Sequence, residues 1–480
     1  SFCLDFANSA DLGNDISSNN NDFTATSMTA VNQTGSSPSS AFCTWNPLRV
    51  NTQTQTFAEG NLRFSSTQTS TNPAATGNYG VSSGKFYWEV FVVAQGNTSN
   101  ILGICDTAAG LEDDTTALYA SALMYGYEFA GTKRNNNSSA SYGDSITTGD
   151  IVGVALDMDN GGVYFSKNGT FQASGDPTSG ASLTNAAFTG LNSAGSGVFQ
   201  PYYLAYSSGD GVANFGQSPT FNGQTTAGGN TDANGRGNFK HSVPSGYTAL
   251  TSANITEPSY QGIDYFAPTL YEGNGTGQRV GDFVPFTDAF NVANSAMFQH
   301  DEARALSRTA GAPSSSGGKK GTWSTWYKTA IIDTDNIFFD NGTTATNRFS
   351  LQMDASGQIV FSYAGTTILM TNADLKGGGL WRNLVLKVDT SLATASARAI
   401  MYIDGVEVTS FATDARASLT QDGELGYMDS GATQFVGSYN GVTANQWDGY
   451  FAETIFLDNQ FLSADSFGQL DTSTNKWVPK

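Results

Sequence analysis

The sequence predicts an all-β protein built from two antiparallel β-sandwich domains that are joined by connectors rich in Asn, Gly and Ser. Short apolar runs recur along the 480 residues with no helical period between them. Turn-forming residues separate these runs, and glycine alone occupies 54 positions. Charged residues make up only 13% of the chain, against about 25% in a typical domain. These features together favour many short strands connected by tight turns.

The chain is too long for one small sandwich, because about 100 to 200 residues form a typical domain. We expect four segments: an N-terminal strand and connector at 1–44, a first sandwich at 45–221, a connector at 222–282, and a second sandwich at 283–480. The first segment has one short apolar run, at 2–6, followed by polar residues. It therefore depends on neighbouring parts of the chain to satisfy its backbone.

Alternating apolar runs mark the strands of the first sandwich, near 61–65, 85–93, 101–105, 125–129, 151–158, 163–167, 202–206 and 211–215. Residues 149–171 are the most informative, because they contain two apolar runs and two turn sequences. Asp-Asn-Gly-Gly at 159–162 and Lys-Asn-Gly at 167–169 supply residues that tolerate positive φ. Both sequences predict hairpins.

The second sandwich shows the same signals. In residues 382–389, Leu384, Leu386 and Val388 lie on one face and the residues between them on the other, which predicts a half-buried strand. Residues 401–408 then predict a hairpin that turns at Asp404 and Gly405.

The first sandwich resembles SPRY domains. The resemblance is carried by Gly-Lys-Phe-Tyr-Trp-Glu-Val at 84–90, by residues 149–171, and by Ala-Asn-Phe-Gly-Gln at 213–217, which occur in the order found in that family. It implies a β-sandwich whose role is binding and whose loops at one end recognise partners.

A basic and amide-rich sequence is the candidate recognition loop. Lys133, Arg134, Asn135 and Asn136 lie between two tyrosines of the SPRY-like region, and we expect them at an exposed loop tip. The alternative is a solvated loop without a ligand.

The second half is similar to the laminin-G-like, concanavalin A-like jelly roll of phage virion proteins. Matching blocks lie at 322–328, 380–385, 400–405, 435–438, 447–458, 462–468 and 477–479. Residues 2–14 resemble the segment that follows such a module in longer phage polypeptides. The chain is thus expected to be one unit of a longer array, or a protomer whose termini approach those of its neighbours; its start at Ser1 rather than Met fits trimming, processing or an upstream region.

The jelly-roll resemblance also implies a calcium site in some family members. Asp333, Asp335 and Asp340 are the candidate ligands because carboxylates suit calcium. A solvated acidic turn is the alternative, and no other cofactor is expected.

A second candidate binding site combines rings with amides. Tyr439, Trp447 and Tyr450 border a polar loop at 440–446 that includes Asn445. A ring flanked by amides is a common arrangement for stacking on a sugar, so Asn445 and Trp447 are candidate ligand-binding residues. A core or interface role for Trp447 is the alternative.

The sequence gives little support for catalysis. His241 and His300 are the only histidines, and the common metalloprotease, phosphate-binding and hydrolase motifs are absent. Glycosidases need two facing carboxylates, but Asp448, Glu453 and Asp458 are five residues apart, a spacing that places neighbours on opposite faces of a regular strand. We therefore expect a protein that is not an enzyme.

The net charge and the hydropathy of the chain limit the classes of partner that it is expected to bind. A net charge of -20 disfavours nucleic acid and anionic membranes as partners, and no apolar run reaches the length of a membrane helix.

Cys105 lies in an apolar run and is expected to be buried. Cys3 and Cys43 form a disulfide only if their segments pair.

The sequence therefore predicts a phage virion structural protein, a fibre, spike or decoration, that acts outside cells. Its expected partners are other copies of itself, other virion proteins or host-surface glycans, with weak contacts summed by repetition. The alternative is a bacterial extracellular adhesin or a head-to-tail filament subunit, and a glycoside hydrolase is a third class.

Overall fold

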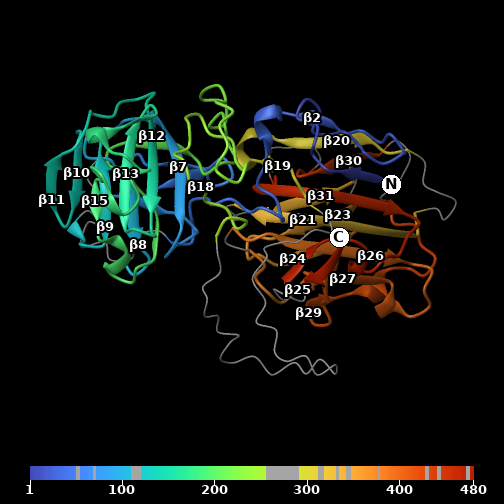
Figure 1. Ribbon diagram of the computed structural model, residues 1–480. Coiled ribbons are helices and arrows are strands. Elements are labelled where there is room, and N and C mark those ends of the chain that lie inside the picture. Colours follow the sequence, from blue (N-terminus) through green and yellow to red (C-terminus); the bar gives the residue numbers. More distant parts are fainter. Residues whose placement is uncertain are drawn as a thin grey trace, which may run out of the picture.

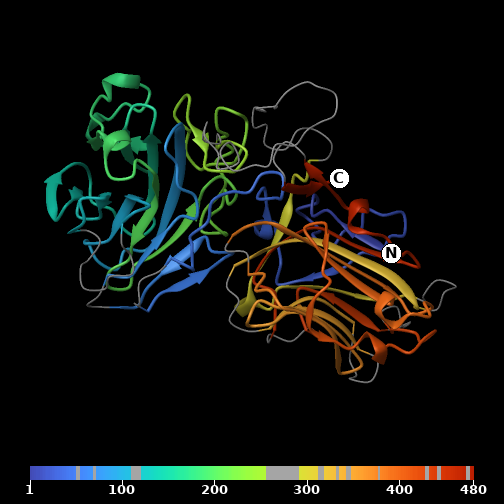
Figure 2. The same cartoon turned by 90° about the horizontal axis from the view of Figure 1, so that it is seen from below.

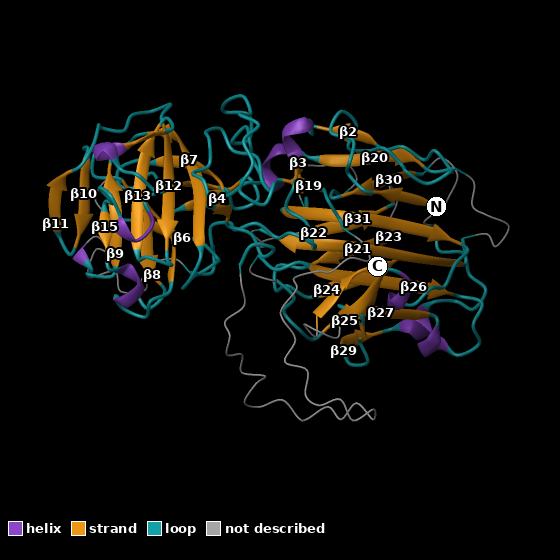
Figure 3. Ribbon diagram, in the orientation of Figure 1, coloured by secondary structure: helices purple, strands orange, loops and turns teal. Residues whose placement is uncertain are grey.

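The computed structural model describes residues 1–49, 54–68, 72–109, 120–255, 291–311, 318–330, 335–341, 348–376, 379–426, 432–439, 445–471 and 476–480. These parts of the chain form two bodies that lie side by side (Figures 1 and 2). Strands dominate both bodies (Figure 3). The all-β fold class is therefore confirmed.

Helical structure in the described ranges is confined to single 3₁₀ turns. They are η1 (Ala30–Asn32), η3 (Gln172–Ser174), η4 (Gly180–Ser182), η5 (Leu191–Ser193), η6 (His300–Glu302), η7 (Ala395–Ala397), η8 (Arg416–Ser418) and η9 (Ala464–Ser466). None of these described turns is long or apolar enough to cross a bilayer.

The first sandwich contains two facing sheets. The β7 sheet has the order β14-β13-β12-β7-β17-β5-β4, with β15 paired to β13 and β18 paired to β7. Its strands are β4 (Thr56–Ala58), β5 (Arg63–Ser65), β7 (Lys85–Ala94), β12 (Ile151–Asp157), β13 (Gly162–Lys167), β14 (Thr170–Phe171), β15 (Phe188–Thr189), β17 (Asp210–Asn214) and β18 (Thr248–Ala249). The β8 sheet has the order β11-β10-β9-β8-β16-β6. Its strands are β6 (Ala74–Thr76), β8 (Ile101–Asp106), β9 (Met124–Glu128), β10 (Thr132–Asn135), β11 (Ser138–Ser141) and β16 (Phe199–Leu204).

The two turn sequences of the first sandwich form the hairpin turns that their residue types predict. Strands β12 and β13 pair from Val152 with Lys167 to Asp157 with Gly162, across the turn that contains Gly161 at φ 77°. Strand β14 follows the second turn, in which Asn168 and Gly169 have φ values of 50° and 83°. In the second turn, positive φ at both central residues gives the chain reversal the twist of the flanking strands; in the first turn Gly161 alone has positive φ. Both hairpins are confirmed.

The core of the first sandwich lies between its sheets. Trp88 and Val154 from the β7 sheet pack with Leu102 and Tyr127 from the β8 sheet, and none of the four is more than 1% exposed. Burial of such large apolar side chains supplies most of the stabilisation of a sandwich.

The second sandwich also has two large sheets. The β31 sheet has the order β28-β27-β26-β21-β31-β19-β3, and β1 also pairs with β31. Its strands are β1 (Phe2–Leu4), β3 (Gln33–Thr34), β19 (Ser295–Phe298), β21 (Lys320–Thr329), β26 (Arg382–Asp389), β27 (Ala399–Ile403), β28 (Val406–Glu407) and β31 (Gly449–Asp458). The β22 sheet has the order β2-β20-β30-β22-β23-β24-β25-β29. Its strands are β2 (Thr24–Thr26), β20 (Ala305–Thr309), β22 (Asn336–Asp340), β23 (Phe349–Met353), β24 (Ile359–Tyr363), β25 (Thr366–Thr371), β29 (Phe411–Asp414) and β30 (Thr433–Val436). A separate hairpin joins β32 (Gly468–Asp471) to β33 (Lys476–Pro479).

The N-terminal segment supplies strands to both sheets of the second sandwich. Strand β1 pairs with β31, β3 with β19, and β2 with β20. Phe2 is fully buried, and its ring lies 5.9 Å from the rings of both Trp323 and Phe456. The chain therefore starts in the second sandwich, leaves it to form the first, and returns, so the first sandwich is an insertion (Figure 1).

The segment that enters the first sandwich lies beside residues 250–251, close to the last described residue of that body. Phe42 forms an isolated antiparallel bridge with Thr251. The amide of Cys43 donates to the carbonyl of Leu250 over 2.9 Å. The entering segment and the segment at 250–251 are thus held together by backbone hydrogen bonds, and the return to the second sandwich, 256–290, lies outside the described residues.

The polar segment that follows residue 221 packs against the first sandwich as far as residue 255. Strand β18 pairs with β7 in parallel, and Phe239 and Tyr247 cover Tyr87 on the outer face of the β7 sheet. The remainder of the expected connector, 256–282, lies outside the described residues.

Strand β26 is buried on both faces, so the half-buried strand expected at 382–389 is wrong. Leu384 and Leu386 face the core, as predicted. Val385 on the opposite face is also fully buried, because Ala464 and Phe467 near the C-terminus pack over it. The alternation of side chains is real, but a second layer of chain covers the face that a two-layer sandwich would expose.

Candidate functional site

The expected basic loop is a β-hairpin. Lys133, Arg134 and Asn135 lie in strand β10, which pairs with β11. Only the turn is a loop, and its residues Asn136 and Asn137 have φ values of 48° and 56°. An Asn pair suits this turn because asparagine tolerates positive φ better than most residues.

The side chains of β10 mostly bind the protein itself. The ammonium of Lys133 donates to the carbonyl of Ala187 over 2.7 Å. Arg134 forms an ion pair of 2.7 Å with Glu128. Asn135 Nδ2 donates to the carbonyl of Met124 over 2.6 Å.

Within this group, Asn136 has an exposed side chain and is the residue best placed to touch a partner.

Trp447 is a core residue, so the sugar-stacking role predicted for it does not fit the structure. It is fully buried, with its ring centroid 4.5 Å from that of Phe338 and 4.6 Å from that of Phe451. Tyr450 is also fully buried. Asn445 is half-buried at φ 60°, and the loop residues 440–444 lie outside the described residues.

The acidic residues of β31 do not follow the simple alternation assumed from sequence. Strand β31 has a bulge, because Ser324 pairs with Ile455 whereas Trp326 pairs with Ala452. Glu453 sits at this bulge with φ 44°. Phe451 and Phe456 both join the core although their spacing is odd, since one extra residue reverses the side-chain alternation. The odd spacing of Asp448, Glu453 and Asp458 therefore does not show whether their side chains lie on the same face of the strand or on opposite faces.

The candidate calcium ligands have other partners. Asp340 is fully buried and forms an ion pair with Arg348. Asp335 accepts a hydrogen bond of 3.3 Å from Gln352, and Asp333 lies outside the described residues. In the described part of the chain, no group of three or more His, Cys, Asp or Glu side chains is arranged to hold a metal ion.

A tight turn of the first sandwich docks onto the second. Glu59 and Gly60 form this turn between β4 and β5, with φ values of 54° and 60°. The Glu59 carboxylate lies 3.2 Å from Arg304, and both side chains are buried. The Gly60 carbonyl accepts a hydrogen bond of 2.8 Å from Tyr450, and a Cβ at Gly60 would overlap that hydroxyl. We call these four residues the junction clamp.

A buried lysine also joins the two bodies. Lys328 is 1% exposed on strand β21, and its ammonium donates to the Phe42 carbonyl over 3.1 Å. Burial lowers its pKa to about 8. A cation in this position ties the crossing segment to the second sandwich.

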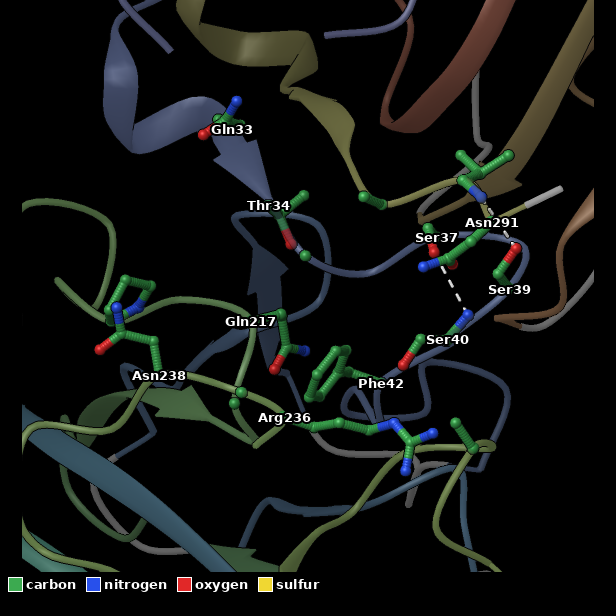
Figure 4. Close-up of a pocket in the computed structure, with 17 residues that line it drawn as sticks. Gln33, Thr34, Ser37, Ser39, Ser40, Phe42, Gln217, Arg236, Asn238 and Asn291 are labelled. Carbon is green, nitrogen blue, oxygen red and sulfur yellow. Dashed lines mark hydrogen bonds between the residues drawn. The ribbon is translucent and has the colours of Figure 1, made fainter. Parts of the chain in front are cut away.

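Between the two bodies lies a polar pocket of about 700 Å³ that is partly open to solvent, which we call the junction cavity (Figure 4). Residues from five separate parts of the chain line it, within 33–42, 216–219, 236–238 and 291–293 and at Ala253. Hydroxyl and amide side chains dominate the wall. Arg236 is the charged residue among those that line it.

The polar side chains of the cavity are held in place by the backbone. Ser37 Oγ accepts from the Ser40 amide over 3.2 Å, and Ser39 Oγ accepts from the Val292 amide over 3.1 Å. Asn238 Oδ1 accepts from the Gly229 amide over 3.0 Å. Fixed side chains form a pre-organised wall, as in ligand sites.

Sequence reasoning missed this cavity because its residues carry no shared motif. Its parts are up to 260 residues apart, from Gln33 to Ala293. The one available signal was a lone basic residue, Arg236, within a stretch that otherwise contains Gly, Asn, Thr, Ala and one Asp.

Comparison with known proteins identifies the first sandwich. Residues 85–218 match the SPRY domain family, so the chain contains a SPRY domain. SPRY domains mediate protein–protein interactions, and the chain therefore carries a protein-binding module.

Two curated relatives share this region. Over 92 residues the chain is 36% identical to ATP-dependent RNA helicase DDX1 of Xenopus laevis. Over 86 residues it is 31% identical to ATP-dependent RNA helicase Ddx1 of Drosophila melanogaster. The matches cover 19% and 18% of this chain and 11% of each helicase, so the chain spans about a tenth of their length.

Solved structures align over about a third of this chain. The SPRY domain of human HERC1 is 20% identical with a TM-score of 0.27, covering 35% of this chain and 96% of that chain. The TRIM65 PSpry domain is 13% identical with a TM-score of 0.27, covering 36% and 91%. Stonustoxin is 18% identical with a TM-score of 0.28, covering 36% and 27%.

Proposed function

We propose that the chain is a non-enzymatic structural and recognition protein, in which the SPRY domain contacts a protein partner and the second sandwich fixes its orientation. The observation that carries this proposal is the insertion of the SPRY domain into the second sandwich, together with the buried contacts of the junction clamp between the two bodies. Buried contacts between two bodies restrain a domain more than a flexible linker alone does.

The finer proposal is a place on a phage particle, as a fibre, spike or decoration exposed to the medium. Two rigid sandwiches and a net charge of -20 support it, because repetition on a particle sums weak contacts and the charge favours solubility. Neighbouring subunits and host-surface glycans are the proposed partners. We expect the chain to work without a catalytic centre or a cofactor.

Antibodies raised against the purified chain test this proposal. In a density gradient of the source material, the antigen is expected to co-sediment with intact particles and to be labelled on their surface by immunogold microscopy. An antigen confined to soluble fractions would contradict the virion assignment. A photo-crosslinker placed at Asn136 identifies the protein partner of the SPRY domain independently of that result.

A further inference from the structure

The junction cavity has hydrogen-bond donors that the described contacts leave available for a ligand. The hydroxyls of Thr34 and Ser39 each accept a backbone amide and keep their own O–H to donate. Asn238 uses its Oδ1 on a backbone amide, which leaves its NH₂ group for another acceptor. A ligand rich in oxygen acceptors complements such a wall.

Arg236 adds a cation without a counter-ion in the described residues. Its Nη1 donates to the neutral Asn254 Oδ1 over 2.8 Å, and none of the ion pairs among described residues includes it. The nearby Asp232 carboxylate is already used, because its two oxygens accept four hydrogen bonds, three from backbone amides and one from Asn254. Guanidinium groups bind carboxylates with two parallel hydrogen bonds.

The size of the cavity favours an oxygen-rich anion that is larger than a simple inorganic ion. About 700 Å³ is far more than a simple ion needs, and it lies in the range of small-molecule sites. The Phe42 ring, 3% exposed, adds an apolar element to the wall.

We propose that the junction cavity binds an acidic sugar, a polyhydroxylated ring whose carboxylate is received by Arg236. This inference rests on the proposed recognition function and assigns one glycan class to one place in the fold. It also gives the contact between the two bodies a second role, since both bodies contribute to the wall.

Saturation-transfer NMR with the full chain tests the proposal. The probes are glucuronate, galacturonate and N-acetylneuraminate, with glucose and acetate as controls for the ring and the charge. At least one acidic sugar is expected to bind, and more tightly than either control. Absence of binding by all three, or equal binding of acetate, would overturn the proposal while leaving the particle assignment to its own test.

Three variants locate the binding. Arg236→Gln is expected to weaken the acidic sugar at least about tenfold, because it loses a charge-assisted bidentate contact. Lys240→Gln removes the same charge four residues away, from a side chain bound to Thr226, and is expected to change affinity less than about twofold. Ala293→Trp fills the cavity from an exposed position and is expected to abolish binding. Wild-type affinity in Arg236→Gln would refute the assignment.

Discussion

At the scale of single residues, buried acids hold the outer layers of the protein in place. Glu89 is fully buried on β7, where its carboxylate accepts from the amides of Lys240 and His241 over 2.8 Å each and from the Tyr87 hydroxyl over 3.1 Å. Burial raises its pKa to about 7, although the three donors favour the ionised form. One side chain thus fixes the segment that covers the β7 sheet.

Glu89→Gln is expected to lower the free energy of unfolding by about 1–3 kcal/mol, because an NH₂ group would then face a backbone donor. Urea denaturation measures the change, and amide hydrogen exchange at Lys240 and His241 is expected to accelerate. Glu407→Gln, at an exposed position on β28, serves as the control. Unchanged exchange at the two amides would contradict this role.

Glu453 predicts a pH dependence. Burial first, and then the charge of Asp5, raise its pKa from 4.5 to about 7. Between these values the folded protein keeps a proton that the unfolded chain has released, so this group makes stability fall as pH rises from about 4.5 to about 7.

Glu453→Gln removes that contribution. Chemical denaturation at the two ends of this pH window is expected to show a smaller loss of stability in Glu453→Gln than in the wild type. The exposed Glu424→Gln is the matched control and is expected to keep the wild-type dependence. Identical slopes in all three proteins would argue against the assignment.

At the scale of elements, local sequence predicts hairpins and misses long-range pairing. Asn168 with Gly169 and Asp404 with Gly405 adopt the positive φ values that their residue types favour, so these turns were readable from sequence. The bulge at Glu453 was not, because bulges arise from pairing with a neighbouring strand. The sequence left two roles open for Trp447, a core residue and a sugar-binding residue, because a ring beside amides has the same local sequence in a core as in a binding site.

The pairing of strand β1 could not be predicted from local sequence either, because its partner β31 lies more than 440 residues away. Phe2→Ala is expected to destabilise the second sandwich by about 3–5 kcal/mol, because it leaves a cavity between the two sheets. Calorimetry measures the loss, and Leu48→Ala, at a residue that is 71% exposed, is the control. Equal melting temperatures of the two variants would show that β1 is dispensable.

At the scale of the whole molecule, the junction clamp couples the two bodies. Arg304 contacts Glu59 in a buried ion pair, and removal of one partner leaves the other charge uncompensated. The fold class and most strands of the SPRY domain followed from sequence, whereas the relation between the bodies depends on contacts across the chain that no local pattern encodes.

Arg304→Ala is therefore expected to uncouple the sandwiches. Two separate thermal transitions should replace a joint one in calorimetry, and small-angle scattering should show a wider range of shapes. Lys319→Ala removes an exposed ion pair with Asp422 and is the control. A single transition and an unchanged scattering profile in Arg304→Ala would disprove the coupling.

The insertion has a mechanical consequence. Both chain ends lie on the second sandwich (Figure 1), and β1 pairs directly with β31 near the C-terminal end of the sequence. A pulling force applied to the two ends therefore passes through the β31 sheet and bypasses the SPRY domain as long as that pairing holds. A tether that held the protein by its termini would load one sandwich and leave the other free of tension.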